Sequence, residues 1–136
     1  VRACNSIHGN IEMAERLRLR EPVAVQGAVR FEVCEVTAFI NAAEPERQYD
    51  IVLALGIFHK LADPAVGVRF AAAATRELLL MRSGKAQERG IITSKFAAKR
   101  SVDAHALLRE AGFELEQMLE GPGPWHENVE YWRRVA

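Results

Sequence analysis

The sequence predicts an α/β protein with a mostly parallel sheet that ends in an antiparallel strand. Three observations support this prediction. The apolar run from Ile51 to Leu55 does not alternate, which is typical of a central, buried, parallel strand with helices on both faces. Strand-like and helix-like segments alternate along most of the chain. The last two strand-like segments, 113–119 and 129–135, are separated by a Gly-Pro turn, so we expect antiparallel neighbours.

The composition indicates one domain without a strongly charged partner. A chain of 136 residues can bury a real core, and we expect it to form a single domain over 1–136. Its 18 Lys and Arg balance 18 Asp and Glu, so the charge carries no strong nucleic-acid signal. The apolar stretches are too short to cross a membrane. Cys4 and Cys34 lie in predicted strands without metal-ligand spacing, which favours reduced thiols, a cytoplasmic protein and no metal site.

The first third of the chain predicts a strand, a helix and a second strand. Residues 1–4 are strand-like, and Asn10 is a suitable cap for a helix that continues to about residue 20. Pro22 and Gly27 bracket a connection. Residues 29–34 then alternate between apolar and polar side chains, as they do in a strand with one buried face.

The second half predicts two helices around a short strand. Asp63 is a suitable cap for a helix over 64–84, because apolar residues recur there at helical spacing. These residues are Val66, Phe70, Ala74, Leu78 and Met81. Residues 90–93 are Gly-Ile-Ile-Thr, whose three β-branched residues predict a short buried strand. Ser101 is a suitable cap for the next helix, and Gly112 is its predicted stop. We expect His105, which lies in this helix, to be a surface or boundary side chain.

The order of these segments resembles the class I methyltransferases that use S-adenosylmethionine. Residues 49–64 are similar to their fourth strand and the loop after it, with an aromatic residue and Asp before the apolar run and a His and Pro after it. Residues 107–113 resemble their helix that ends in Ala-Gly-Phe. Residues 1–14 and 29–35 are similar to their second strand with its helix and to their third strand. The resemblance implies a Rossmann-like three-layer sandwich.

The resemblance also implies a site for S-adenosylmethionine as cofactor. The residues that it assigns to the cofactor are Asn5, Ser6, Glu35, Val36, Leu55 and Gly56. Asn5 takes the place of an acidic residue that holds the ribose hydroxyls, and its amide can still bond a hydroxyl. Glu35 falls where a carboxylate receives the adenine amino group. The resemblance therefore predicts that Asn5, Glu35 and Gly56 converge at the carboxyl edge of one sheet.

His59 is the candidate catalytic residue, which would orient or deprotonate the methyl acceptor. The alternative is a loop histidine packed under the next helix. Lys60 stands where the family more often has a second His, and a protonated lysine cannot accept a proton.

The family's first strand and glycine-rich loop have no counterpart in the sequence. We therefore expect an incomplete methyltransferase fold whose sheet is completed by a missing N-terminal segment or by self-association. Two functions stay open. One is a methyltransferase domain fragment that acts on an unidentified acceptor, and the other is a degenerate, non-catalytic binding or scaffold module. We expect the chain alone to be inactive and to bind S-adenosylmethionine weakly or not at all.

Overall fold

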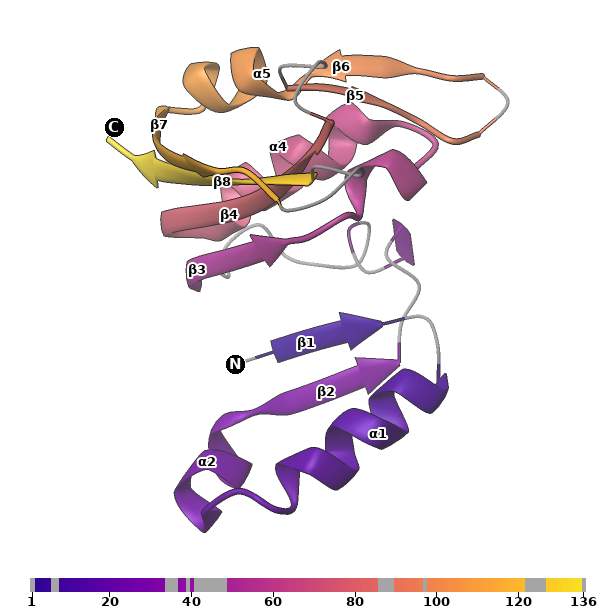
Figure 1. Cartoon of the computed structure of the whole chain (residues 1–136), viewed down its shortest axis with the longest axis vertical. Helices are drawn as coiled ribbons and strands as arrows, with labels where there is room; N and C mark the ends of the chain where they lie inside the picture. The colour runs from indigo at the N-terminus through magenta and orange to yellow at the C-terminus, as the bar shows by residue number, and fades with distance from the viewer. Residues whose placement is uncertain are drawn as a thin grey trace. The chain divides into compact units, whose positions relative to one another are not determined.

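The computed structural model shows two compact units, Val1–Ala43 and Glu44–Ala136 (Figure 1). The structure describes residues 2–5, 8–33, 37–38, 40, 49–85, 90–96, 98–121 and 127–135, without the side chains of 2–5, 8, 30–33, 83–85 and 127. The single domain over 1–136 stays a prediction. Among the described residues, no helix is both long and apolar enough to cross a membrane.

The first unit is a β-α-α-β segment with a parallel strand pair (Figure 1). Strand β1 (Arg2–Asn5) pairs with β2 (Arg30–Val33) so that Asn5 lies opposite Val33. Helices α1 (His8–Arg18) and α2 (Val23–Ala28) connect the two strands. The predicted strands are thus confirmed, and both end at the same edge of their small sheet.

The predicted start of α1 and the predicted connection after it are wrong. Asn10 lies inside α1 instead of capping it. The connection contains α2, because the Pro22 carbonyl oxygen accepts hydrogen bonds from the N–H groups of Val25 and Gln26. The Gln26 side chain also donates to the Glu21 carbonyl oxygen (2.7 Å). A proline with its fixed φ can precede a helix without loss of a hydrogen bond, so Pro22 starts a helix there.

The second unit has a four-stranded sheet in the order β3-β4-β8-β7 (Figure 1). The strands are β3 (Tyr49–Ala54), β4 (Thr75–Lys85), β7 (Phe113–Leu119) and β8 (Glu127–Arg134). Strand β3 is parallel to β4, and β8 is antiparallel to both β4 and β7. The antiparallel finish is confirmed. Residues 122–126 of the predicted turn lie outside the described residues.

The predicted helix over 64–84 is confirmed for its first half and wrong for its second half, which forms a strand. Asp63 caps α4 (Pro64–Ala74) by accepting from the Ala65 N–H (3.1 Å), as predicted. Residues 75–85 form β4 instead. The consecutive apolar residues 78–81 also suit a strand flanked on both sides, and β4 pairs with β3 and β8. Gly84 therefore lies inside a strand and ends no helix.

Arg134 of β8 binds the carbonyl groups where two helices end. Its guanidinium donates to the carbonyl oxygens of Ala72 (2.6 Å) and Thr75 (3.0 Å) at the end of α4. It also donates to the carbonyl oxygen of Ala111 (3.1 Å), just after α5 (Ala104–Glu110). Carbonyl groups at helix ends lose their usual donors four residues later and carry the negative end of the helix dipole, so a cation there favours the observed helix ends.

Strand β3 is parallel as predicted, but it is neither central nor buried in the sheet of its unit. It stands at the end of the strand order. Ile51 and Leu53 are 57% and 63% exposed, whereas Ala54 is buried. Successive strand residues point to opposite faces, so only one face of β3 is packed against the core. The expectation of burial on both faces is wrong for this strand.

A hairpin separate from the main sheet precedes α5. Strand β5 (Ile91–Thr93) pairs antiparallel with β6 (Ser101–Asp103), so Ser101 lies in a strand and does not cap a helix. The cap is Asp103, whose carboxylate accepts from the Ala106 N–H (3.0 Å). The predicted glycine stop is confirmed, since Gly112 follows the helix with φ of +84°.

The core lies where α4 and α5 pack on the sheet, and it contains a buried carboxylate. Trp132, Leu79 and Glu130 are fully buried. The Glu130 oxygens lie 2.8 and 2.9 Å from His105 Nε2, and Trp132 Nε1 donates to the same carboxylate (2.8 Å). His105 is 9% exposed, so the prediction of a surface or boundary side chain is wrong. It is buried because it pairs with the carboxylate from β8.

Candidate functional site

The segment after β3 has an exposed start and two buried anchors. Leu55 is 47% exposed, and Gly56 has φ of +70°, in the left-handed region that glycine adopts without strain. A short 3₁₀ helix, η1 (Phe58–Lys60), follows. Phe58 and Leu61 are each 4% exposed, so they anchor the segment in the core. The chain therefore turns sharply at Gly56 and is held immediately after it.

Gly67 of α4 makes room for these two anchors. A Cβ atom on Gly67 would clash with the Leu61 side chain and would lie 2.9 Å from Phe58 Cδ1. The absence of a side chain thus allows the helix and the segment after β3 to approach closely. This contact holds the segment after β3 close to α4.

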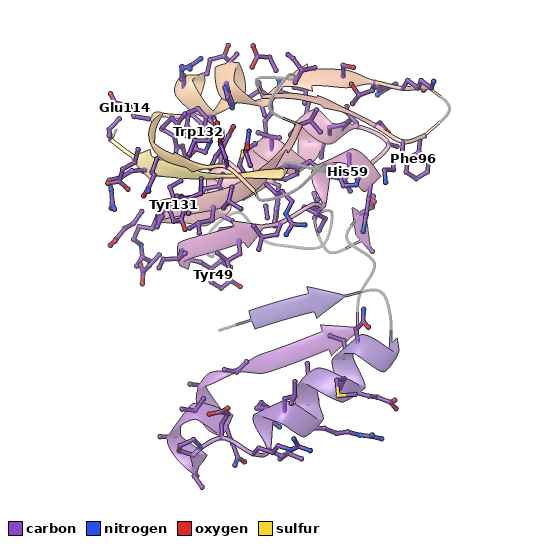
Figure 2. The ribbon with its side chains drawn as sticks, in the orientation of Figure 1. Tyr49, His59, Phe96, Glu114, Tyr131 and Trp132 are labelled. Carbon is purple, nitrogen blue, oxygen red and sulfur yellow. The ribbon has the colours of Figure 1, made fainter. Side chains whose placement is uncertain are left out.

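His59 lies between the two anchors and is half-buried (Figure 2). The Lys95 N–H donates to the His59 carbonyl oxygen (2.8 Å). The Ser94 hydroxyl donates to the Leu61 carbonyl oxygen (2.6 Å). The loop after β5 therefore holds the backbone at His59 and two residues after it. Phe58 and Leu61 take the buried positions near α4, whereas His59 keeps partial access to solvent.

Arg82 reaches the same place from the neighbouring strand. The pairing of Ala54 with Met81 brings Arg82 of β4 level with Leu55, just beyond the carboxyl end of β3, while β4 itself continues to Lys85. A Cβ atom on Gly56 would lie 3.8 Å from Arg82 Nη1 and 4.0 Å from His59 Cε1. Gly56, His59 and Arg82 therefore form one cluster, which we call the β3-end cluster.

Sequence reasoning missed Arg82 because it assigned residues 75–84 to a helix. A basic residue that directly follows the apolar run 78–81 was the available signal. In a strand paired with β3, that position lies beside the carboxyl end of β3, and open α/β sheets bind ligands at the carboxyl ends of their strands. Because residues 75–84 were assigned to a helix, the position of Arg82 beside β3 was not predicted.

The chemistry of the β3-end cluster suits a polar or anionic ligand group. A guanidinium carries five N–H donors in a planar fork, and an imidazole can accept or donate a proton. The bare backbone at Gly56 lets a ligand approach closely. The described side chains include no group of three or more His, Cys, Asp or Glu that could hold a metal ion.

The other predicted site residues are placed only in part. Asn5 ends β1, beside Val33 at the end of β2, but its side chain lies outside the described residues. Ser6, Glu35 and Val36 lie outside them altogether. Leu55, Gly56 and His59 are close together after β3. Asn5 belongs to the first unit and Gly56 to the second, so their convergence with Glu35 stays a prediction.

Comparison with known proteins identifies the fold. No family model matches the chain, and no curated protein sequence matches it. Solved structures match nearly its whole length. The chain is similar to magnesium protoporphyrin IX methyltransferase (ChlM) from Synechocystis PCC 6803 with bound SAM, at a TM-score of 0.70 and 12% identity over 99% of this chain and 59% of that one.

Two further solved structures are similar over almost all of the chain. The N-methyltransferase NodS from Bradyrhizobium japonicum WM9 has a TM-score of 0.67 and 10% identity, and the match covers 99% of this chain and 73% of NodS. The [4+2]-cyclase SpnF has a TM-score of 0.67 and 10% identity, with 98% and 66% covered. The chain spans 59% and 64% of the length of two ChlM structures. The chain therefore has the class I methyltransferase fold, a Rossmann-like α/β fold, as the sequence predicts.

Proposed function

We propose that the chain is the carboxyl-side portion of an S-adenosylmethionine-dependent methyltransferase domain with an unidentified acceptor. The observation that carries the proposal is the likeness to a methyltransferase with bound SAM over 99% of this chain. The β3-end cluster supports it, because the cluster lies at the carboxyl end of β3, next to the parallel strand β4. That edge is the general ligand site of open α/β sheets.

S-adenosylmethionine, when bound, supplies an electrophilic methyl carbon on a sulfonium. In the proposal, the backbone at Leu55 and Gly56 borders the methionine part and the methyl group. The positive φ of Gly56 turns the chain away at that point, and the missing side chain leaves space. Asn5, Ser6, Glu35 and Val36 are proposed to hold the ribose and adenine, as the resemblance implies.

His59 is proposed to orient the acceptor or to take the proton that it loses. The residue is half-buried, and the Lys95 N–H holds its backbone, so the ring starts from a defined position. Arg82 is proposed to position the acceptor through hydrogen bonds. Methyl transfer needs mainly alignment and exclusion of water, so positioning of this kind suffices for a rate enhancement.

A chimera tests the proposal. The chain replaces the matching part of Synechocystis ChlM, and isothermal titration measures binding of S-adenosylmethionine. We expect the chimera to bind and the chain alone to bind weakly or not at all. Glu35→Ala in the chimera should weaken binding by about 1–3 kcal/mol, the scale of a hydrogen bond to a charged group. Glu114→Ala, at an exposed position of β7, is the matched control.

A scaffold or binding module is the second candidate function. Asn5 in place of an acidic residue favours it, and one fold can host unrelated functions. A folded chimera that does not bind S-adenosylmethionine would support this candidate against the first. Circular dichroism and cooperative unfolding would establish that the chimera is folded.

A further inference from the structure

The hairpin of β5 and β6 ends in a basic tip that carries an exposed aromatic ring. We call residues 94–100 the hairpin tip, and the structure describes all of them except residue 97. The hairpin tip contains Lys95, Lys99 and Arg100 and no acidic residue, although the chain as a whole is neutral. Phe96 is 54% exposed. Cations beside an exposed ring can bind molecules that have both a negative charge and a planar ring.

Hydrogen bonds hold the hairpin tip in a defined conformation. The Lys99 N–H donates to the Phe96 carbonyl oxygen, and the Ser94 N–H donates to the Arg100 carbonyl oxygen (2.8 Å each). The Phe96 N–H donates to the Ser94 hydroxyl (3.1 Å). Lys99 has φ of +43°, a conformation that a residue with a side chain keeps only where its surroundings hold it. The exposed position of Phe96 is therefore part of an ordered turn.

The hairpin tip is attached to the β3-end cluster. The Lys95 N–H donates to the carbonyl oxygen of His59 (2.8 Å), so the backbones of the hairpin tip and of η1 are in direct contact. His59 and Phe96 lie on the same side of the second unit (Figure 2). His59 also lies close to Gly56, and Arg82 reaches Gly56 from β4. The exposed ring, the imidazole and the guanidinium therefore belong to one continuous region of the second unit.

Positive charge predominates in this region. Lys60 is exposed next to His59, and Arg82, Lys95 and Lys99 are exposed as well. Arg100 pairs with Asp63 at 3.4 Å. Among the described residues, no acidic side chain forms an ion pair with Lys60, Lys95 or Lys99. A group of cations from separate elements attracts an anionic ligand more strongly than a single surface lysine does.

We propose that the β3-end cluster and the hairpin tip together bind a small methyl acceptor that has a carboxylate or a phosphate on a planar ring. This inference rests on the proposed function and names the class of its acceptor. Arg82 and Lys95 bind the anionic group, because a guanidinium fits such a group with two parallel hydrogen bonds. Phe96 packs against the ring. The anionic group anchors the acceptor, and a separate oxygen or nitrogen atom of the acceptor receives the methyl group near His59.

Binding of two matched probes to the 136-residue chain tests the inference without any cofactor. The probes are 6-hydroxy-2-naphthoate and its neutral carboxamide, and ligand-observed NMR titration measures their dissociation constants. A ligand of this size should bind at about 1 mM or more tightly if it uses the site well. We expect the carboxylate to bind at least about fivefold more tightly than the carboxamide, because its hydrogen bonds are charge-assisted. Replacing the carboxylate with 2-naphthyl phosphate tells which of the two anions the site prefers.

Single substitutions separate the two parts of the site. Arg82→Gln and Lys95→Gln should each reduce the preference for the carboxylate to less than about twofold, because each removes a cation that binds it. Phe96→Ala should weaken both probes by about fivefold and keep the preference, and Phe96→Tyr should restore binding. Arg133→Gln is the matched control, since Arg133 is exposed on β8 opposite Leu78, toward the other end of β4 from Arg82. This control should leave both dissociation constants unchanged.

Several results would overturn the inference, provided that circular dichroism shows each variant to be folded. They are equal binding of the carboxylate and the carboxamide by the wild-type chain, no binding of the carboxylate at about 1 mM, and a preference that survives both Arg82→Gln and Lys95→Gln. If Arg82→Gln does not fold, Lys95→Gln and Phe96→Ala at exposed positions decide the matter. Tighter binding of a short single-stranded oligonucleotide than of the carboxylate, lost in Phe96→Ala, would assign the hairpin tip to nucleic acid instead.

The proposed function fails in a different measurement. Titration of the ChlM chimera with S-adenosylmethionine tests the methyltransferase, whereas the two probes test the anion-binding site in the chain itself. Selective binding of the carboxylate without cofactor binding by the folded chimera would support the site and contradict the methyltransferase. Cofactor binding by the chimera without selectivity between the probes would do the opposite.

Discussion

Strands β3 and β8 belong to one sheet, yet β3 exposes apolar side chains whereas β8 buries a charged one. Ile51 and Leu53 of β3 are more than half exposed. Glu130 of β8 is fully buried. Strand β8 lies between β4 and β7, whereas β3 has one neighbour among the described strands. The place of a strand in the sheet, more than the polarity of its residues, therefore decides which side chains are buried.

The comparison also shows what a buried charge requires. The Glu130 carboxylate has His105 and Trp132 within hydrogen-bond distance. Burial of a carboxylate is costly unless such partners replace water. An exposed leucine costs little in a single chain, but it favours association. The stability of the unit should therefore depend more on β8 than on β3.

The largest expected effect is at Trp132. Trp132→Ala should lower the free energy of unfolding by about 3–5 kcal/mol, because it empties a large core volume and removes a donor from Glu130. Urea denaturation measures the change. Tyr131→Ala, next in sequence but only half-buried, is the control. Equal losses for the two variants would contradict the difference in burial between the two faces of β8.

The next effect concerns the partner of the buried carboxylate. His105→Ala should lower the free energy of unfolding by about 3 kcal/mol, since a fully buried carboxylate loses a hydrogen-bond partner. Glu110→Ala, exposed at the end of the same helix, should change it by less than about 0.5 kcal/mol. Thermal or urea unfolding of both variants decides the matter. A loss at His105 no larger than at Glu110 would mean that the pair does not stabilise the core.

A third prediction tests how the end of β3 is held. Gly67→Ala should lower the free energy of unfolding by about 1–2 kcal/mol, because the new methyl group collides with Leu61 and Phe58. Gly9→Ala in α1 is the matched control, since its new Cβ would meet no atom within 4 Å. That control should be neutral or slightly stabilising. A neutral Gly67→Ala would show that the segment after β3 is not held by close packing.

The smallest expected effect is on β3 itself. Ile51→Thr should change the free energy of unfolding by less than about 0.5 kcal/mol, because the side chain is 57% exposed. The measurement uses protein dilute enough to be monomeric, so that association does not contribute. A loss comparable to that of Trp132→Ala would mean that the Ile51 side chain is covered within the single chain.

The sequence by itself determined the local features. The Asp63 cap, the glycine stop at Gly112 and the antiparallel pair of β7 and β8 depend on residues close together in the chain, and all three are confirmed. The parallel direction of β3 was also predicted from its apolar run. The order of the predicted helices and strands along the chain was enough to indicate the class I methyltransferase fold. Such features follow from nearby backbone hydrogen bonds and turn geometry, which a sequence carries directly.

Only the tertiary structure decided the rest. Residues 78–81 suit a helix or a strand equally well by their apolar pattern, and pairing with β3 and β8 selected the strand. That choice brought Arg82 to Gly56 and His59. His105 is buried where it pairs with Glu130, which lies 25 residues away in the sequence. These outcomes depend on which distant segments supply hydrogen bonds and cover apolar area, and periodicity along one segment cannot encode its neighbours.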